Sequence, residues 1–238
     1  MSAQTSPGTS ALDVRLPGID PTLYLVTDSA QCASVNRSVA ATVAEAVAGG
    51  AHVVQVRDKD VSDSEFLALT LEVLDAVETV RDREGIDRPV PVFVNDRVPV
   101  AAELNAAGHL VHVHVGQSDM GPALVREAIG TQPLIGLSAA IPEEFRIARE
   151  TGVVDLVGIG PVYDTTTKKD APGGIGPARL RDLAAEAGIP SVGIGGIDVA
   201  RAPELRGTGV EGICVVSAIC LAEDPRAAAR ALREAYGA

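Results

Sequence analysis

The chain has few aromatic residues and little positive charge. Aromatic side chains make up 3% of its 238 residues and tryptophan is absent. Its core must therefore be built from Val, Ile, Leu and Ala, which suit parallel strands covered by helices. Lys and Arg number 20 against 32 Asp and Glu, a net charge of −12. Because nucleic acids and anionic membranes attract broad basic surfaces, we expect neither as a partner. An anionic substrate would need a local cluster of cations.

Cysteines and long apolar runs are also scarce. Cys32, Cys214 and Cys220 show no metal-binding spacing, which fits a reducing compartment. No apolar run approaches the length of a signal peptide or a membrane span, so the sequence predicts a cytoplasmic protein. We expect residues 1–20 to form a loosely ordered N-terminal extension. Since no linker or charge block divides the remainder, we expect residues 21–238 to form one domain.

Short apolar runs alternate with amphipathic or Ala-rich segments along the chain. The predicted strands are residues 23–27, 52–56, 91–94, 110–113, 134–137, 156–159, 191–194 and 212–216. The predicted helices are residues 39–48, 64–81, 98–107, 123–129, 143–150, 178–187, 199–205 and 225–236. Such alternation predicts parallel strands with right-handed crossovers, and eight units of this size predict an α/β fold, a single (β/α)8 TIM barrel. An open doubly wound sheet is the alternative, but the glycine-rich turn that usually follows its first strand is missing.

Polar groups follow the second predicted strand, at the end where such barrels place their active sites. Gln55, Arg57 and Lys59 are every second residue of an extended segment that includes the apolar Val54 and Val56, so their side chains should point the same way. Arg can bind two phosphate oxygens at once, and Lys adds charge. The alternative is a surface loop with a salt-bridged Asp58. The alternation favours an anion-binding site.

Carboxylates follow the third and fourth predicted strands. Asp96, next to Asn95, and Asp119 could each simply cap a helix or lie in a loop. However, adjacent barrel strands lie about 5 Å apart, so both carboxylates could bind one cation. Oxygen ligands beside a phosphorylated substrate favour Mg²⁺. We expect His112 and His114 to line the barrel wall, although a zinc site of histidine and carboxylate remains open.

The remaining strand ends carry hydroxyls and glycines. Ser138 has no base beside it in the sequence, so a hydrogen-bonding role is favoured over a nucleophilic one. Three threonines, residues 165–167, precede Lys168 and suit a phosphorylated ligand, although a solvated flexible loop is the alternative. GIGG at 193–196 and VVSAI at 215–219 follow the strands where these barrels often bind phosphate. Two anion sites around one metal suggest two phosphorylated substrates that are joined as one loses diphosphate.

These motifs resemble those of the thiamine-phosphate synthase family, which joins the pyrimidine and thiazole halves of thiamine. The resemblance lies in their shared order and spacing over nearly the whole predicted barrel. The motifs are QVRDK at 55–59, VND at 94–96, VHVGQSD at 113–119, GLSA at 136–139, GIGPVYDTTTKKDAP at 158–172, VGIGGI at 192–197 and VVSAI at 215–219.

The resemblance implies a transferase that joins 4-amino-2-methyl-5-(diphosphooxymethyl)pyrimidine to a thiazole phosphate, or to its carboxylated form, and uses Mg²⁺. It leaves a homo-oligomer open. The residues implied for the pyrimidine diphosphate are Gln55, Val56, Arg57, Asp58, Lys59, Asn95, Ser138 and Lys168, of which Arg57, Lys59, Ser138 and Lys168 are implied to be catalytic. Asp96 and Asp119 are implied as Mg²⁺ ligands. The residues implied for the thiazole phosphate are Thr165, Thr166, Thr167, Gly195, Gly196, Val216 and Ser217.

Three positions depart from the family pattern: Ser118, Ala140 and Asp164. None of them removes an implied ligand, but Asp164 adds negative charge beside the phosphate loop. One rival interpretation is a thiazole tautomerase of the same barrel family, which has no diphosphate to bind. A phosphate-binding barrel isomerase would need a catalytic acid–base pair instead of a metal pair. A non-catalytic sensor of a phosphorylated ligand would need no Mg²⁺.

Overall fold

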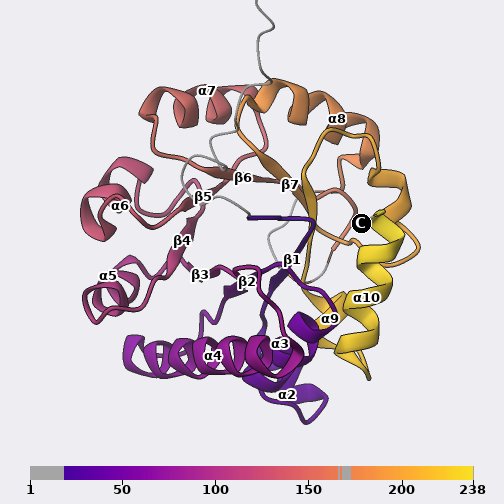
Figure 1. Ribbon diagram of the computed structural model, residues 1–238. Coiled ribbons are helices and arrows are strands. Elements are labelled where there is room, and N and C mark those ends of the chain that lie inside the picture. Colours follow the sequence, from indigo (N-terminus) through magenta and orange to yellow (C-terminus); the bar gives the residue numbers. More distant parts are fainter. Residues whose placement is uncertain (1–18, 166, 168–172, 238) are drawn as a thin grey trace, which may run out of the picture.

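The computed structural model describes residues 19–165, 167 and 173–237, and it shows a closed barrel of eight parallel strands (Figure 1). The strands pair in chain order, and β8 closes the barrel against β1. They are β1 (Leu23–Val26), β2 (Val53–Val56), β3 (Val92–Asn95), β4 (His112–Val115), β5 (Ile135–Ser138), β6 (Leu156–Ile159), β7 (Ser191–Ile194) and β8 (Gly212–Val215). The predicted (β/α)8 barrel is confirmed. The predicted N-terminal extension lies almost entirely outside the described residues.

Helices surround the barrel in Figure 1. They are α2 (Ser29–Ser34), α3 (Val39–Ala48), α4 (Asp63–Glu84), α5 (Val98–Ala106), α6 (Pro122–Ile129), α7 (Pro142–Thr151), α8 (Gly176–Ala187), the 3-10 helix η1 (Ala202–Leu205), α9 (Ser217–Cys220) and α10 (Pro225–Tyr236). The sequence shows clearly where α4 begins and ends. Ser62 and Glu65 form a capping box at its start, and Gly85 ends it with a left-handed conformation. Among the described residues, no helix is long and apolar enough to cross a membrane.

The short helices α2 and α9 were not predicted from the sequence, and two predicted elements have different bounds for a clear local reason. The fourth strand begins at His112 and not at Leu110, because Leu110 is 47% exposed and the side chain of Asn105 binds the backbone of Val111 before the strand starts. The helix predicted over 199–205 is only the single 3-10 turn η1, which contains Pro203. Proline lacks the N–H that a longer α-helix would need at this position.

Alternate strand residues face two different apolar regions. One set, which includes Val54 and Val56, packs between the barrel and the helices. The other set, which includes Tyr24, Phe93 and Cys214, fills the barrel interior. Because side chains alternate along a strand, the interior face continues through Asn95 and other polar residues toward the carboxyl ends. This alternation positions the candidate site.

Candidate active site

The end of β2 connects the barrel interior to its rim. Gln55 is buried, and its Nε2 donates a hydrogen bond to the Tyr24 hydroxyl at 2.8 Å. Two residues later, the Arg57 N–H donates to the Thr27 hydroxyl at 3.0 Å, and its guanidinium lies 4.0 Å from the Asp28 carboxylate. The three polar groups of the sequence motif therefore extend from inside the barrel to its mouth. Gln55 lies deepest, so it could contact only a ligand group that enters the barrel.

Asp28 is a candidate residue that the sequence reasoning did not identify. Its carboxylate accepts a hydrogen bond from the Gln31 N–H and so caps α2, while its second oxygen faces Arg57. An acidic residue directly after β1 was the available signal. With this carboxylate beside it, the guanidinium of Arg57 is oriented before any substrate binds.

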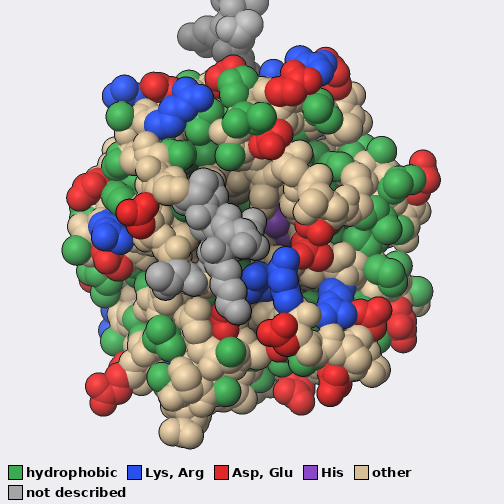
Figure 2. Space-filling model, turned by 180° about the vertical axis from the view of Figure 1, so that it is seen from behind, with side chains coloured by type: hydrophobic (Ala, Val, Ile, Leu, Met, Phe, Trp, Pro, Cys, Tyr) green, Lys and Arg blue, Asp and Glu red, His purple; other side chains and the backbone are tan. Residues whose placement is uncertain are grey.

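Lys59, Asp96 and Asp119 form a charged cluster across the ends of β2, β3 and β4. Lys59 Nζ lies 3.3 Å from Asp96 Oδ2. Partial burial and, second, the nearby Asp119 carboxylate raise the pKa of the Asp96 carboxyl above its usual value, whereas Lys59 acts in the opposite direction. The two carboxylates therefore lie near each other at the rim. Figure 2 shows a face where basic and acidic side chains lie together around a histidine in a hollow.

The backbone around both carboxylates is shaped to present them. Asp96 has a φ of 59°, the left-handed region that Asp and Asn adopt more readily than most residues, and Asn95 precedes it at the rim. The Gly116 N–H donates to Asp119 Oδ2 at 2.8 Å. A Cβ at Gly116 would lie only 2.9 Å from that oxygen, so glycine permits the close approach. The left-handed backbone of Asp96 is notable, because a non-glycine residue held in that conformation often marks a functional site.

These two carboxylates fit the magnesium ion that the sequence predicts. Mg²⁺ is commonly held by one or two carboxylates together with substrate phosphates and water. A divalent cation would also relieve the repulsion that raises the pKa of Asp96. Zinc fits less well, because no three His, Cys, Asp or Glu side chains among the described residues gather as a metal site.

The two histidines of β4 are structural neighbours of the cluster. His112 Nδ1 accepts a hydrogen bond from the Leu134 N–H at 3.0 Å. His114 Nε2 lies 3.0 Å from the Ser138 hydroxyl, and a Cβ at Gly136 would collide with its ring. Burial lowers the pKa of both imidazoles to about 4, so both are neutral near pH 7. His114 therefore positions the exposed Ser138, and β5 leaves it the necessary room.

Residues predicted for the thiazole phosphate meet in a pocket of about 470 Å³ beside β7 and β8. Thr165, Thr167, Gly196 and Ser217 are in its lining. The backbone supports this arrangement, because Gly196 has a φ of 63° and a Cβ there would lie 2.6 Å from the Asp164 carbonyl oxygen. Only glycine allows the β7 loop to approach the β6 loop so closely.

The other implied residues differ in what they can offer a ligand. Val56 is fully buried with its side chain in the layer between strands and helices, so it could contact a substrate only through its backbone. The Asp58 carboxylate accepts a hydrogen bond from the Asp60 N–H and thereby shapes its own loop. Gly195 and Val216 adjoin the pocket residues in sequence. Thr166 and Lys168 lie outside the described residues.

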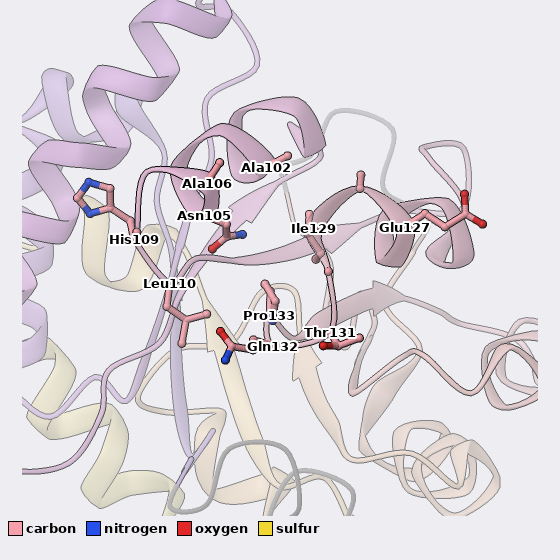
Figure 3. Close-up of a pocket in the computed structure, with 13 residues that line it drawn as sticks. Ala102, Asn105, Ala106, His109, Leu110, Glu127, Ile129, Thr131, Gln132 and Pro133 are labelled. Atoms are coloured by element: carbon pink, nitrogen blue, oxygen red, sulfur yellow. The ribbon is translucent and has the colours of Figure 1, made fainter.

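A second hollow, of about 560 Å³, lies at the opposite end of the barrel between α5 and α6 (Figure 3). Its wall includes Asn105, Leu110 and Gln132. It is built from the loops that precede β4 and β5, where conserved features of this fold usually serve stability. Asn105 is already committed to the backbone of Val111. The hollow between α5 and α6 is therefore more consistent with a structural role, and the candidate active site is the one at the carboxyl ends of the strands.

Comparison with known proteins gives a consistent result. A family model described as thiamine monophosphate synthase matches residues 23–219. A thiamine-phosphate synthase from Xanthobacter autotrophicus is 42% identical over 218 residues, which cover 91% of this chain and 95% of that protein. Another from Chloroflexus aurantiacus is 43% identical over 215 residues, which cover 90% of this chain and 92% of that protein.

Solved structures agree with this assignment. Thiamine phosphate pyrophosphorylase from Pyrococcus furiosus has a TM-score of 0.73 and 32% identity, covering 91% of this chain and 95% of that one. A 3-hexulose-6-phosphate synthase, at a TM-score of 0.57 and 20% identity, shares the fold alone. Since the family model spans all eight strands and relatives above 40% identity align over nine-tenths of the sequence, the chain belongs to the thiamine monophosphate synthase family of transferases.

Proposed function

We propose that the chain joins 4-amino-2-methyl-5-(diphosphooxymethyl)pyrimidine to a thiazole phosphate, giving thiamine phosphate and diphosphate. The observation that carries this proposal is the pairing of two anion-binding regions on one rim. Charged side chains from β2 to β4 surround one region, with Lys59 3.3 Å from Asp96. Hydroxyls and Gly196 line the other region beside β7 and β8. The diphosphate and the phosphate monoester would each have a separate region.

In the proposed reaction the bond between the pyrimidine methylene carbon and the diphosphate oxygen breaks, and the thiazole nitrogen bonds to that carbon. Arg57 and Lys59 would stabilise the negative charge that develops on the departing diphosphate. The aminopyrimidine ring can carry the resulting positive charge, so no nucleophile or strong base from the protein is required. Holding the two substrates in contact would supply much of the remaining rate.

Mg²⁺ is the proposed cofactor, with Asp96 and Asp119 as its ligands. When bound, it would act as a Lewis acid that neutralises charge on the diphosphate. The support is the donor set itself, two carboxyl groups close enough to repel each other at the rim. The protein's part would be to hold the two carboxylates at the rim, through the left-handed backbone of Asp96 and the hydrogen bond from the Gly116 N–H to Asp119.

The remaining proposed contacts follow from position on the rim. Ser138, oriented by His114, is exposed, and its hydroxyl can form a hydrogen bond with the pyrimidine substrate. Gln55 and Asn95 occupy the interior face below it and could bind the pyrimidine ring. For Lys168 the proposal rests on sequence alone.

A thiazole tautomerase is the second candidate, because the pocket beside β7 and β8 could bind a thiazole phosphate by itself. A tautomerase would have no use for a diphosphate site. The meeting of Arg57, Lys59, Asp96 and Asp119 at the other half of the rim favours the synthase. The names of the relatives above 40% identity agree with this choice.

The decisive experiment mixes both substrates with the purified protein and measures thiamine phosphate and diphosphate by chromatography. We expect equal amounts of both products, loss of both with EDTA, and recovery when Mg²⁺ is added in excess. Release of neither product would overturn the proposal. A change of the thiazole phosphate alone, without its partner, would indicate the tautomerase. Binding of phosphate without turnover would indicate a sensor.

The cytoplasm is the proposed compartment, because Cys32, Cys214 and Cys220 are free and buried. Small phosphorylated molecules are the proposed partners. Whether a homo-oligomer forms is a separate proposal that sedimentation of the purified chain would test.

A further inference from the structure

Arg201 lies at the edge of the pocket beside β7 and β8, although no sequence motif pointed to it. It follows β7 by seven residues and directly precedes η1. Among the described residues that line this pocket, it is the only Lys or Arg, and it shares the lining with Thr165, Thr167 and Ser217. A guanidinium beside three hydroxyls is a donor set that suits a phosphate.

Two contacts hold the Arg201 side chain in one orientation. Its Nη1 donates to the Gly196 carbonyl oxygen at 2.7 Å, and its guanidinium carbon lies 4.9 Å from the centre of the Tyr163 ring. Tyr163 is itself fixed, because its hydroxyl donates to Glu204 at 2.9 Å. Arg has five N–H donors, so one bond to a carbonyl leaves most of them for a ligand. Stacking on Tyr163 occupies a face of the guanidinium and leaves its edge free.

Negative charges surround Arg201, so binding of an anion in this pocket would depend on its positive charge. Asp164 and Asp198 also line the pocket, so removal of Arg201 would leave only negative charge among its described charged residues. No ion pair joins the Arg201 guanidinium to a described carboxylate, and the Asp198 carboxylate accepts a hydrogen bond from the Arg201 backbone N–H and not from its guanidinium. The whole chain carries −12, so an incoming dianion is repelled unless a local cation compensates.

We propose that Arg201 is a specificity-determining residue that binds the phosphate of the thiazole substrate and selects the phosphorylated thiazole over its alcohol. This inference rests on the proposed function. The guanidinium edge acts together with the Thr and Ser hydroxyls, while its bond to Gly196 ties the phosphate contact to the β7 loop. The contribution of Arg201 disappears when the substrate lacks a phosphate.

Arg201→Gln tests this role through separate kinetic constants. We expect the KM for thiazole phosphate to rise about 10- to 100-fold, the range for loss of a hydrogen bond to a charged group. The KM for the pyrimidine diphosphate should not change. The rate with the thiazole alcohol should also not change, so the preference for the phosphorylated substrate should fall by the same factor. A merely structural role would reduce turnover of both thiazoles together.

Arg201→Lys and Arg181→Gln serve as matched controls. Lysine keeps the charge but loses the planar group that stacks on Tyr163, so we expect a partial rise in KM. Arg181 is exposed on α8 and lies outside the pocket lining, so its substitution changes net charge equally and should leave the KM unaltered. An equal rise in KM for Arg181→Gln would show that only the overall field matters and would overturn the proposal.

Binding of inorganic phosphate tests Arg201 without turnover. Phosphate should raise the melting temperature of the unmodified protein by mass action, and the Arg201→Gln protein should need a higher phosphate concentration for the same shift. An identical shift in both proteins would overturn the inference even if thiamine phosphate is formed. If the phosphate shift depends on Arg201 but no thiamine phosphate forms, the proposed function fails and the assignment of Arg201 to phosphate stands.

Discussion

The two halves of the rim that we propose to bind anions are built from different parts of the chain. From β2 to β5 the groups are charged or polar side chains, such as Arg57, Lys59 and Asp96, that extend from the strand ends. From β6 to β8 they are hydroxyls, closely packed backbone, where Gly196 approaches the Asp164 carbonyl, and the guanidinium of Arg201. We expect substitutions in the first half to impair chemistry and spare the fold. In the second half, binding and stability should change together.

The largest expected effect is that of Asp96→Asn. Asn adopts the left-handed conformation as readily as Asp, and loss of the charge removes repulsion from Asp119. We therefore expect an unchanged or slightly higher melting temperature. If Asp96 holds the proposed Mg²⁺, loss of its charge should remove several kcal/mol of transition-state stabilisation and lower kcat by about 10³-fold. Calorimetry measures the melting temperature, and kinetics in parallel measure kcat. A large fall in melting temperature would show that the first half of the rim also supports the fold, contrary to the comparison.

Lys59→Gln should have the next largest effect. Lys59 is 55% exposed, so its loss should cost little stability. In the proposed reaction Lys59 stabilises the charge that develops on the leaving diphosphate, so its replacement should lower kcat by about 10²-fold. Kinetics with each substrate varied in turn measure this effect. A rise only in the KM for thiazole phosphate would contradict the separation of the two regions.

Gly196→Ala should affect the second half of the rim. The new Cβ would meet the Asp164 carbonyl at 2.6 Å in a left-handed backbone, so we expect a loss of about 2–3 kcal/mol in unfolding free energy. The KM for thiazole phosphate should rise as well. Gly207→Ala is the matched control, because Gly207 has a φ of 74° and no atom within 4 Å of the added Cβ. If Gly196→Ala and Gly207→Ala lower the free energy of urea unfolding equally, the close packing at Gly196 does not contribute to the loss.

The smallest expected effect lies in the barrel interior beneath both halves. Burial lowers the pKa of His112 to about 4 in the folded state, against about 6.5 when unfolded. The unfolded chain therefore binds the proton first, and this contribution to stability is complete above pH 6.5 and is lost as pH falls toward 4. Between pH 7 and pH 5 it should cost about 2 kcal/mol.

His112→Asn should remove that part of the acid sensitivity. The comparison is the change in unfolding free energy between pH 7 and pH 5 for the two proteins, which does not depend on how much the substitution destabilises at pH 7. Equal changes would show that His112 is not the group responsible. His52 and His114, whose pKa values burial also lowers to about 4, should account for sensitivity that remains.

Much of the fold could be predicted because local patterns repeat eight times. Each short apolar run is followed by a helical pattern. The short helices α2 and α9 were missed, and the start of β4 and the length of η1 were misplaced. The two misplaced bounds arise from local effects that hydrophobicity does not report, an Asn side chain that binds backbone in one case and a proline in the other. The barrel itself tolerates such shifts, because its topology depends on the order of the elements.

The site was less completely predictable. Motifs indicated Asp96 and Asp119, but not that the Asp119 carboxylate raises the pKa of Asp96 or that Asp96 adopts a left-handed backbone. Asp28 and Arg201 belong to no motif, and each acquires its role through a partner distant in sequence, Arg57 in one case and Tyr163 in the other.

The sequence by itself determined the barrel, the family and the rim residue types, because strand periodicity and the motifs at strand ends are local properties of the chain. Only the tertiary structure decided which side chains meet, how deeply Gln55 lies and that Val56 faces the helices. The physical reason is closure of the barrel. It brings strand ends that are tens of residues apart in sequence to one rim, where distances of a few ångströms set charge, orientation and pKa.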